Sequence, residues 1–296
     1  MYPPSLKKGD CVCIISPSGA VYGRHVDGAK IRLESWGLNV AEGDNTRKKV
    51  GRYAGTLSER SHDLQFALDN PEIKAIFCSR GGYGLAQMID KIDFSDFVRR
   101  PKWVIGFSDA TVLHCAVTHQ NTASLHAMMS KNMSEADHDS QPLLLTKRIL
   151  FGDTPEYNLP KNDYNIAGKA TGRIIGGNFT VFMGLRHTPF DLNFEHAILF
   201  IEDIGEEAYK IDRMMQNLRL SGALDQISGI IAGQFTGYDS KEEKVESVIS
   251  EIMKPYRIPV CFDFPSGHIT DNYPLILGER AELCVDSTGT HLRYLK

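Results

Sequence analysis

Short apolar runs alternate with segments of helical periodicity through the first 120 residues, and this alternation restricts the fold more than any other feature. The runs expected to form strands are residues 11–15, 38–40, 75–78 and 103–106. The segments expected to form helices are residues 25–36, 58–68, 85–89 and 110–118. Because parallel neighbouring strands need a crossover connection, this order predicts an α/β fold with a doubly wound, mostly parallel sheet covered on both faces.

A second α/β domain is expected after a polar, turn-rich stretch. Residues 151–166 contain two polar turns, each with one proline, and predict a linker between an N-terminal domain of residues 1–150 and a C-terminal domain of residues 167–296. Further strands are expected at residues 168–175, 197–201, 229–233, 259–262 and in the tail 281–295. Helices are expected at residues 209–220 and 245–253. The carboxyl ends of the strands are then the expected place for a site.

Charge, hydropathy and cysteine spacing exclude several classes of function. The formal net charge is −4, which argues against a nucleic-acid partner. No apolar run is long enough for a membrane span or for the core of a signal peptide, so a cytoplasmic protein is expected. The six cysteines form no C-x-x-C pair, so we expect buried free thiols and no metal or other cofactor.

Ser108 is the first candidate for chemistry, because it lies between an apolar strand and a helix. A serine on such a turn exposes its hydroxyl, and the next amide, that of Asp109, then points toward an oxyanion formed by attack. The match to the G-x-S-x-G pattern of a nucleophile elbow is partial, since Ala110 replaces the second glycine. The same residues also fit a simple helix cap, with Ser108 or Asp109 as the capping side chain.

A glycine-rich turn follows another expected strand. Gly81 and Gly82 can bring backbone N–H groups close to an anion and so predict a second oxyanion donor. An ordinary strand-to-helix turn is the alternative. Arg80, directly before them, is a candidate for binding a substrate carboxylate, because a buried anion needs a cationic partner.

Glu202 and His268 are candidates for the acid and the base. Glu202 directly follows a strongly apolar strand, where a carboxylate normally needs a partner such as a histidine that it orients. His268 follows a glycine in a polar loop, although a lone loop histidine is most often a surface residue. His114 and His126 are rival bases, because both lie close after Ser108 in the sequence.

Six motifs, in order, resemble those of the LD-carboxypeptidase family, which includes muramoyltetrapeptide carboxypeptidases and microcin-immunity serine peptidases. They are residues 15–19, 80–84, 105–109, 176–178, 201–206 and 267–268, so the resemblance extends over nearly the full length. It implies a Ser-His-Glu triad of Ser108, His268 and Glu202, with Ser108 in the N-terminal domain and the other two in the C-terminal one. The resemblance therefore also implies a site between the two domains. It also implies an oxyanion hole from the amides of Asp109 and Gly81 or Gly82, a homodimer and no metal.

The resemblance leaves the substrate open between two branches. One branch releases the terminal D-alanine of peptidoglycan tetrapeptides during cell-wall recycling; the other cleaves an amide in peptidyl-nucleotide antibiotics such as microcin C. The short stretch between residues 178 and 197 favours the first, because it leaves little room for a nucleotide-recognising loop. One departure concerns the substrate cleft: Ala127, Met128 and Met129 follow His126, where the family often has Gly-Pro. A two-domain binding protein for a small anionic ligand, without catalysis, is the alternative from another class.

Overall fold

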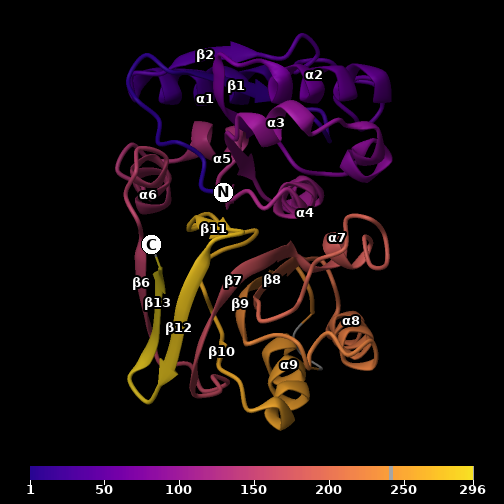
Figure 1. Ribbon diagram of the computed structural model, residues 1–296, viewed down its shortest axis with the longest axis vertical. Helices are drawn as coiled ribbons and strands as arrows, with labels where there is room; N and C mark the ends of the chain where they lie inside the picture. The colour runs from indigo at the N-terminus through magenta and orange to yellow at the C-terminus, as the bar shows by residue number, and fades with distance from the viewer. Residues whose placement is uncertain (240–242, 296) are drawn as a thin grey trace. The chain divides into compact units, whose positions relative to one another are not determined.

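The computed structural model describes residues 1–239 and 243–295, and the chain divides into two compact units (Figure 1). Unit 1 comprises Met1–Asp153 and Thr270–Ile276, and unit 2 comprises Thr154–Ile269 and Leu277–Lys296. The chain therefore returns to unit 1 for one short segment after the loop that carries His268. Each unit is built on its own sheet, in agreement with the expected fold of two α/β domains.

The sheet of unit 1 has the strand order β11-β5-β4-β3-β1-β2. Its strands are β1 (Cys11–Ile15), β2 (Asn39–Glu42), β3 (Ile73–Cys78), β4 (Trp103–Gly106), β5 (Ser124–His126) and β11 (Leu275–Leu277). The pairs β1–β2, β1–β3, β3–β4 and β4–β5 are all parallel. Because β1, β3 and β4 are neighbours, the loops that follow them leave the sheet at the same edge.

Helices and 3₁₀ turns connect these strands. The helices are α1 (Gly23–Ser35), α2 (Leu57–Asp69), α3 (Ser95–Arg99), α4 (Thr111–His119), α5 (Ser130–Glu135) and α6 (Gln141–Leu150). The 3₁₀ turns are η1 (Leu85–Gln87), η2 (Ile89–Lys91) and η3 (Ser108–Ala110). Helix α2 begins where its sequence predicts, because Thr56 and Glu59 form a reciprocal capping box.

The sheet of unit 2 is mixed, with the order β10-β9-β8-β7-β12-β13-β6. Its strands are β6 (Glu156–Pro160), β7 (Gly168–Asn178), β8 (Ile198–Ile204), β9 (Gly229–Thr236), β10 (Val260–Cys261), β12 (Arg280–Asp286) and β13 (Gly289–Tyr294). Strands β7 to β10 are parallel, whereas β12 is antiparallel to β7 and β13. The helical elements are α7 (Phe179–Met183), α8 (Ala208–Leu220), α9 (Val245–Met253) and η4 (Lys254–Tyr256).

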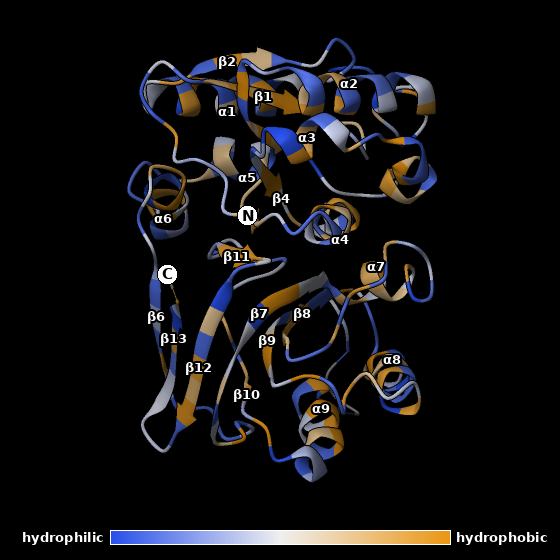
Figure 2. Cartoon of the chain, in the orientation of Figure 1, coloured by the Kyte–Doolittle hydropathy of each residue, from blue (hydrophilic) through white to orange (hydrophobic). Residues whose placement is uncertain are grey.

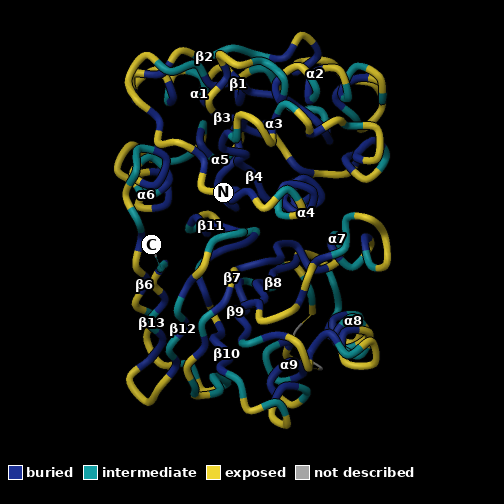
Figure 3. Tube along the Cα trace, viewed as in Figure 1, coloured by how far each residue is buried: buried dark blue, intermediate teal, exposed yellow. Residues whose placement is uncertain are grey.

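The central strands form the core of each unit. They are among the most hydrophobic segments in Figure 2 and are buried in Figure 3, whereas the outer helices carry exposed residues. Every residue of β4 is buried, and the first six residues of β8 are buried as well. Such continuous apolar runs are typical of parallel strands covered on both faces. Within the described ranges, no helix combines the length and the apolar character needed to cross a bilayer.

Three local expectations differ from the structure. Residues 85–89 do not begin an α-helix but form parts of η1 and η2, after Gly84 with a φ of 153° that only glycine adopts readily. Residues 156–160, inside the expected linker, form β6, because their backbone pairs with β13. Strand β11 lies within the expected C-terminal domain, yet it pairs in the sheet of unit 1. The tail 281–295, by contrast, is extended as expected and forms the antiparallel hairpin of β12 and β13.

Candidate active site

Ser108 occupies a strained turn directly after β4. Its φ is 63°, in the left-handed region that residues other than glycine rarely adopt. Phe107 before it is extended, and Ser108 opens the 3₁₀ turn η3 that leads into α4. A sharp strand-to-helix turn with strained backbone is the local geometry of a nucleophile elbow.

The helix-cap interpretation of this turn is wrong. Helix α4 has Ala110 as its N-cap and no side-chain capping bond, and η3 has none either. The carboxylate of Asp109 instead accepts hydrogen bonds from Ser18 Oγ at 2.5 Å and from the backbone N–H of Leu85 at 3.0 Å. Asp109 thus fixes the turn to the loops after β1 and β3, which a cap would not do.

A buried arginine strengthens the same junction. Arg60, on α2, donates to the carbonyl oxygens of Pro17 at 2.9 Å and Gly84 at 3.1 Å and is 2% exposed. Burial raises the pKa of Asp109, while its hydrogen bonds and the charge of Arg60 act in the opposite direction. Sequence reasoning missed Arg60. It included Ser18 in the motif 15–19, in the loop after β1, but gave it no role in holding the Ser108 turn.

Gly81 lies against the side chain of Ser108. A Cβ placed on Gly81 would be 2.7 Å from Ser108 Oγ and 3.4 Å from the amide nitrogen of Asp109. Its carbonyl oxygen accepts a hydrogen bond of 3.0 Å from the N–H of Gly19. Gly82 follows with a φ of 110°. The turn therefore has to be glycine for steric reasons, and it brings main-chain atoms next to the hydroxyl of Ser108.

Glu202 and His268 form a pair in unit 2. Glu202 lies on β8, and His268 lies in the loop after β10. His268 Nδ1 is 2.8 Å from Glu202 Oε2, and the two side chains are 15% and 0% exposed. His268 is therefore not an ordinary surface residue of a polar loop.

The electrostatics of the pair favour a protonated imidazole. Burial alone would lower the pKa of His268, but the hydrogen bond to Glu202 and the negative charges of Glu202 and Asp203 outweigh it and raise that pKa. A carboxylate at Nδ1 holds the ring in the tautomer whose basic nitrogen is Nε2. Such a pair can take a proton from a hydroxyl and stabilise the imidazolium that results.

Two glycines make room for the pair. A Cβ on Gly267 would lie 2.9 Å from Glu202 Oε2, and the φ of Gly267 is 134°. A Cβ on Gly233, in β9, would lie 2.4 Å from the carbonyl oxygen of Ser266 and 3.2 Å from Glu202 Cβ. The loop can approach β8 and β9 this closely only because both positions lack a side chain.

The rival histidines are buried in the core of unit 1. His114 contacts Ser124 Oγ at 2.8 Å and the carbonyl oxygen of Gly106 at 2.9 Å, and burial lowers its pKa to about 3. His126 is 0% exposed, and its ring packs against Phe107 with centroids 5.8 Å apart. His114 has both ring nitrogens engaged and is therefore a poor general base.

The structure thus brings together the candidates within each unit. Ser108, Asp109 and Gly81 meet in unit 1, and Glu202 meets His268 in unit 2. Arg80 has an exposed side chain that donates to the carbonyl oxygen of Ala20 at 2.8 Å. That the two groups combine in one triad stays a prediction.

Comparison with known proteins gives the family. The model of the LD-carboxypeptidase N-terminal domain matches residues 12–127, and that of the C-terminal domain matches residues 171–283. "Probable murein peptide carboxypeptidase" of Bacillus subtilis (strain 168) is 32% identical, over 95% of this chain and 91% of its own. The chain belongs to the LD-carboxypeptidase family.

Two further proteins similar to this chain represent the two kinds of activity found among its relatives' names. The crystal structure of muramoyltetrapeptide carboxypeptidase from Oxalobacter formigenes superposes with a TM-score of 0.89, at 26% identity, over 97% of this chain and 99% of that one. The microcin C7 self-immunity protein MccF of Escherichia coli is 26% identical, over 86% of this chain and 84% of its own. The fold and the peptidase class expected from the motifs are therefore confirmed at the level of the family.

The segment that departs from the family pattern contributes to the core. Leu125, His126, Ala127, Met128 and Met129 are each at most 5% exposed. The methionines take the place of the Gly-Pro that the family often has there, and they pack rather than face solvent. The six cysteines are free, and Cys13, Cys78, Cys115 and Cys261 are buried, as the spacing predicts.

Proposed function

We propose that the chain is a serine carboxypeptidase that releases the terminal D-alanine of peptidoglycan tetrapeptides by hydrolysing the L,D-peptide bond. The observation that carries the proposal is the contact of 2.8 Å between His268 and the fully buried Glu202. A carboxylate without exposed surface next to a histidine is the arrangement that an acid–base pair requires. Membership of a family of peptidases supports the reaction class.

The mechanism begins with Ser108. Its Oγ attacks the carbonyl carbon of the scissile bond while His268 Nε2 takes the hydroxyl proton. The C–N bond then breaks, His268 gives the proton to the nitrogen of the leaving D-alanine, and an acyl-enzyme remains. A water molecule, deprotonated by His268, hydrolyses the ester and restores Ser108.

Backbone amides are proposed to stabilise the oxyanion. The N–H of Asp109 and one from Gly81 or Gly82 are the donors, because these main-chain atoms adjoin the Ser108 side chain. Fixed N–H dipoles at this point cost no reorganisation when the charge develops. The proposal involves no metal or other cofactor. A homodimer stays a prediction from the resemblance, and a cytoplasmic location stays a prediction from the sequence.

The test is D-alanine release from a purified tetrapeptide. The wild type should release D-alanine, whereas Ser108→Ala should lose at least about 10⁴-fold in kcat, because the nucleophile is gone. Ser35→Ala is the matched control: its hydroxyl donates only to the carbonyl oxygen of Arg32 on the surface of α1, so its rate should equal that of the wild type. Full activity in Ser108→Ala would overturn the proposal.

Cleavage of a peptidyl-nucleotide amide is the second candidate, because the similarity to the self-immunity protein MccF favours it. Against it, the stretch from residue 184 to 197 is folded on itself: Arg186 forms an ion pair of 2.9 Å with Asp191 and stacks over the ring of Phe194. A short, self-contained loop offers little to recognise a nucleotide.

Offering both substrates to the same preparation decides between the two reactions. We expect kcat/KM to be higher for the tetrapeptide than for an aminoacyl sulfamoyl adenosine. The reverse order would assign the protein to the other branch. Binding of the intact tetrapeptide without any release of D-alanine would instead indicate a binding protein.

A further inference from the structure

A pocket in unit 1 gathers positive charge beside the turn that contacts Ser108. It has a volume of about 450 Å³ and lies beyond the carboxyl ends of β1 and β3. Three of the residues that line it are cations: Lys49, Arg52 and Arg80. None of its described lining residues is a carboxylate.

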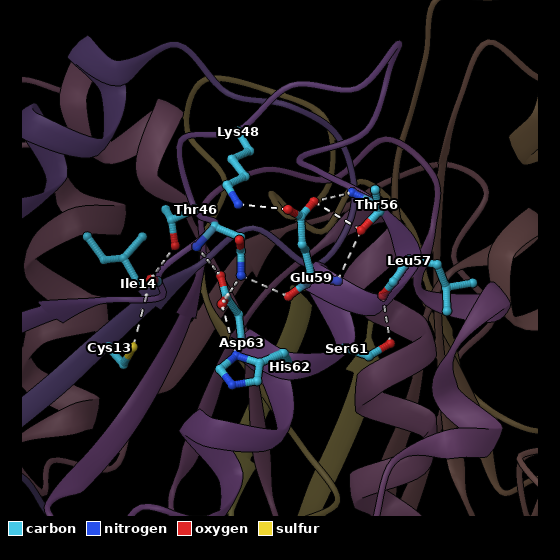
Figure 4. A network of polar contacts seen from close by, with 11 residues as sticks. Cys13, Ile14, Thr46, Lys48, Thr56, Leu57, Glu59, Ser61, His62 and Asp63 are labelled. Atoms are coloured by element: carbon cyan, nitrogen blue, oxygen red, sulfur yellow. Dashed lines mark hydrogen bonds and ion pairs between the residues drawn. The ribbon is translucent and has the colours of Figure 1, made fainter.

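The three cations of the pocket differ from their neighbours in the sequence. Arg47 forms ion pairs with Asp27 and Glu42. Lys48 Nζ lies 2.7 Å from Glu59 Oε1, a contact that Figure 4 shows. Over residues 1–239 and 243–295, by contrast, no carboxylate lies within ion-pair distance of Lys49, Arg52 or Arg80. Their charge is therefore available to an anion from outside.

The pocket is held in place by the backbone. The N–H of Ala20 donates to the carbonyl oxygen of Arg52 at 2.9 Å, and the carbonyl oxygen of Ala20 accepts from Arg80 Nη1 at 2.8 Å. One residue thus fixes the main chain of one arginine and the side chain of the other. The Arg80 guanidinium is thus already positioned, and a positioned cation loses less entropy when an anion binds.

The loop that carries Lys49 and Arg52 is fixed at its base. Asn45 donates to both carboxylate oxygens of Asp63 on α2, through its backbone N–H at 2.9 Å and its side chain at 2.7 Å. Thr46 Oγ1 donates to the carbonyl oxygen of Ile14 at 3.0 Å, a contact drawn in Figure 4. The loop is therefore anchored to both β1 and α2.

The pocket adjoins the candidate nucleophile. Arg80 and Gly82 line it, and Gly81 between them is the residue whose Cβ would lie 2.7 Å from Ser108 Oγ. In a carboxypeptidase substrate the terminal carboxylate is only three bonds from the scissile carbonyl carbon, a separation of about one residue along the chain. A carboxylate held there is thus at the right order of distance from Ser108.

We propose that Lys49, Arg52 and Arg80 form the site that binds the terminal carboxylate of the peptide substrate. Planar guanidinium groups suit this task, because each can donate two parallel hydrogen bonds to one carboxylate. Such a site explains how an enzyme would restrict itself to the last residue of a peptide. The inference rests on the proposed carboxypeptidase function and adds to it the residues that select a free carboxyl end.

Equilibrium binding tests the site independently of turnover. In a Ser108→Ala background, calorimetry compares the tetrapeptide with the same peptide ending in a carboxamide. Arg52→Met and Arg80→Met should each weaken binding of the acid by about 10- to 100-fold, the effect of losing a charge-assisted hydrogen bond. They should leave the weaker binding of the amide unchanged. Lys48→Met, in the same loop but paired with Glu59, is the control and should bind the acid like the parent.

Hydrolysis by the enzyme with Ser108 intact is the second arm. Arg52→Met should raise KM for the acid more than it lowers kcat, and should have no effect on any residual cleavage of the amide. Equal losses of binding for acid and amide, or no loss for the acid, would overturn the inference. A wild type that binds the acid through these arginines but releases no D-alanine would overturn the proposed reaction and leave the carboxylate site supported.

Discussion

The region around Ser108 and the region around His268 achieve their geometry by different physical means. In unit 1 the conformation of the backbone is decisive: a φ of 63° at Ser108, a glycine against its side chain and main-chain bonds between neighbouring loops. In unit 2 the buried side-chain charge is decisive, because Glu202 is inaccessible to solvent and raises the pKa of His268 against the effect of burial. The first region fixes the position of Ser108 Oγ, and the second sets the pKa of His268 and therefore the pH range in which it can accept a proton.

This difference predicts how each region responds to substitution. A change at the Ser108 turn should alter the rate without altering the pKa of His268, since the effect is one of position. A change at Glu202 should alter both, since the carboxylate sets the tautomer and the charge of the imidazole.

Glu202→Gln should have the largest effect of the three substitutions considered. Loss of the carboxylate should lower kcat by about 10³- to 10⁴-fold, because the amide no longer selects the tautomer or stabilises the imidazolium. Glu202 raises the pKa of His268, so its removal should lower that pKa. The base works in its neutral form, which is lost as the pH falls. The acid limb of the residual kcat/KM profile should therefore move to lower pH.

The pH profile of D-alanine release measures this prediction. Glu206→Gln is the matched control. Glu206 forms an ion pair of 3.0 Å with Lys210 and is not among the groups that shift the pKa of His268, so this substitution should leave both rate and profile unchanged. An acid limb that moves to higher pH in Glu202→Gln would contradict the account of the pair.

Gly81→Ala should lower kcat less than Glu202→Gln does, and it should act through the position of Ser108 and not through the pKa of His268. The new methyl group would lie 2.7 Å from Ser108 Oγ, so either the serine or the turn has to move. We expect kcat to fall by about 10²- to 10³-fold, the scale of losing one oxyanion donor. The NMR titration of His268 should be the same as in the wild type. A shifted titration would show that the two regions do not respond separately.

Asp109→Asn should have the smallest effect on rate and a visible one on stability. The carboxylate accepts from Ser18 and Leu85 through one oxygen, Oδ2, and it also accepts from the backbone N–H of Gly84. An amide has one acceptor oxygen where the carboxylate has two, so it cannot keep every one of these bonds. A lost buried hydrogen bond costs about 1–3 kcal/mol. Urea unfolding should report a decrease of that size, with kcat changed by less than about tenfold. Unaltered stability would mean that Asp109 does not anchor the turn.

The sequence predicts the fold well where apolar runs are continuous. Strands β1, β3, β4, β8 and β9 follow directly from such runs. Strand β11 was missed because it has three residues and pairs with a sheet formed far earlier in the chain. Strand β6 was missed because its five residues mix polar and apolar side chains between two turns, and only its pairing with β13 makes it a strand.

The candidate site was predictable in part. Ser108 could be selected from its place between a strand and a helix, but the same pattern fitted a cap until the bonds of Asp109 were known. Glu202 and His268 are far apart in sequence, so the ordered family motifs were needed to connect them. Lys49 and Arg52 lie in a loop where basic residues are usually only solvated, and nothing in their spacing separates them from Arg47 and Lys48.

Labelling with a fluorophosphonate, located by mass spectrometry of the digested protein, shows whether Ser108 is the reactive nucleophile. A reactive serine should form one adduct, on the peptide that contains Ser108, and His268→Ala should slow its formation strongly because the base is absent. The account predicts labelling at Ser108 that disappears in Ser108→Ala. A stable adduct on another serine, at an undiminished rate in Ser108→Ala, would contradict it.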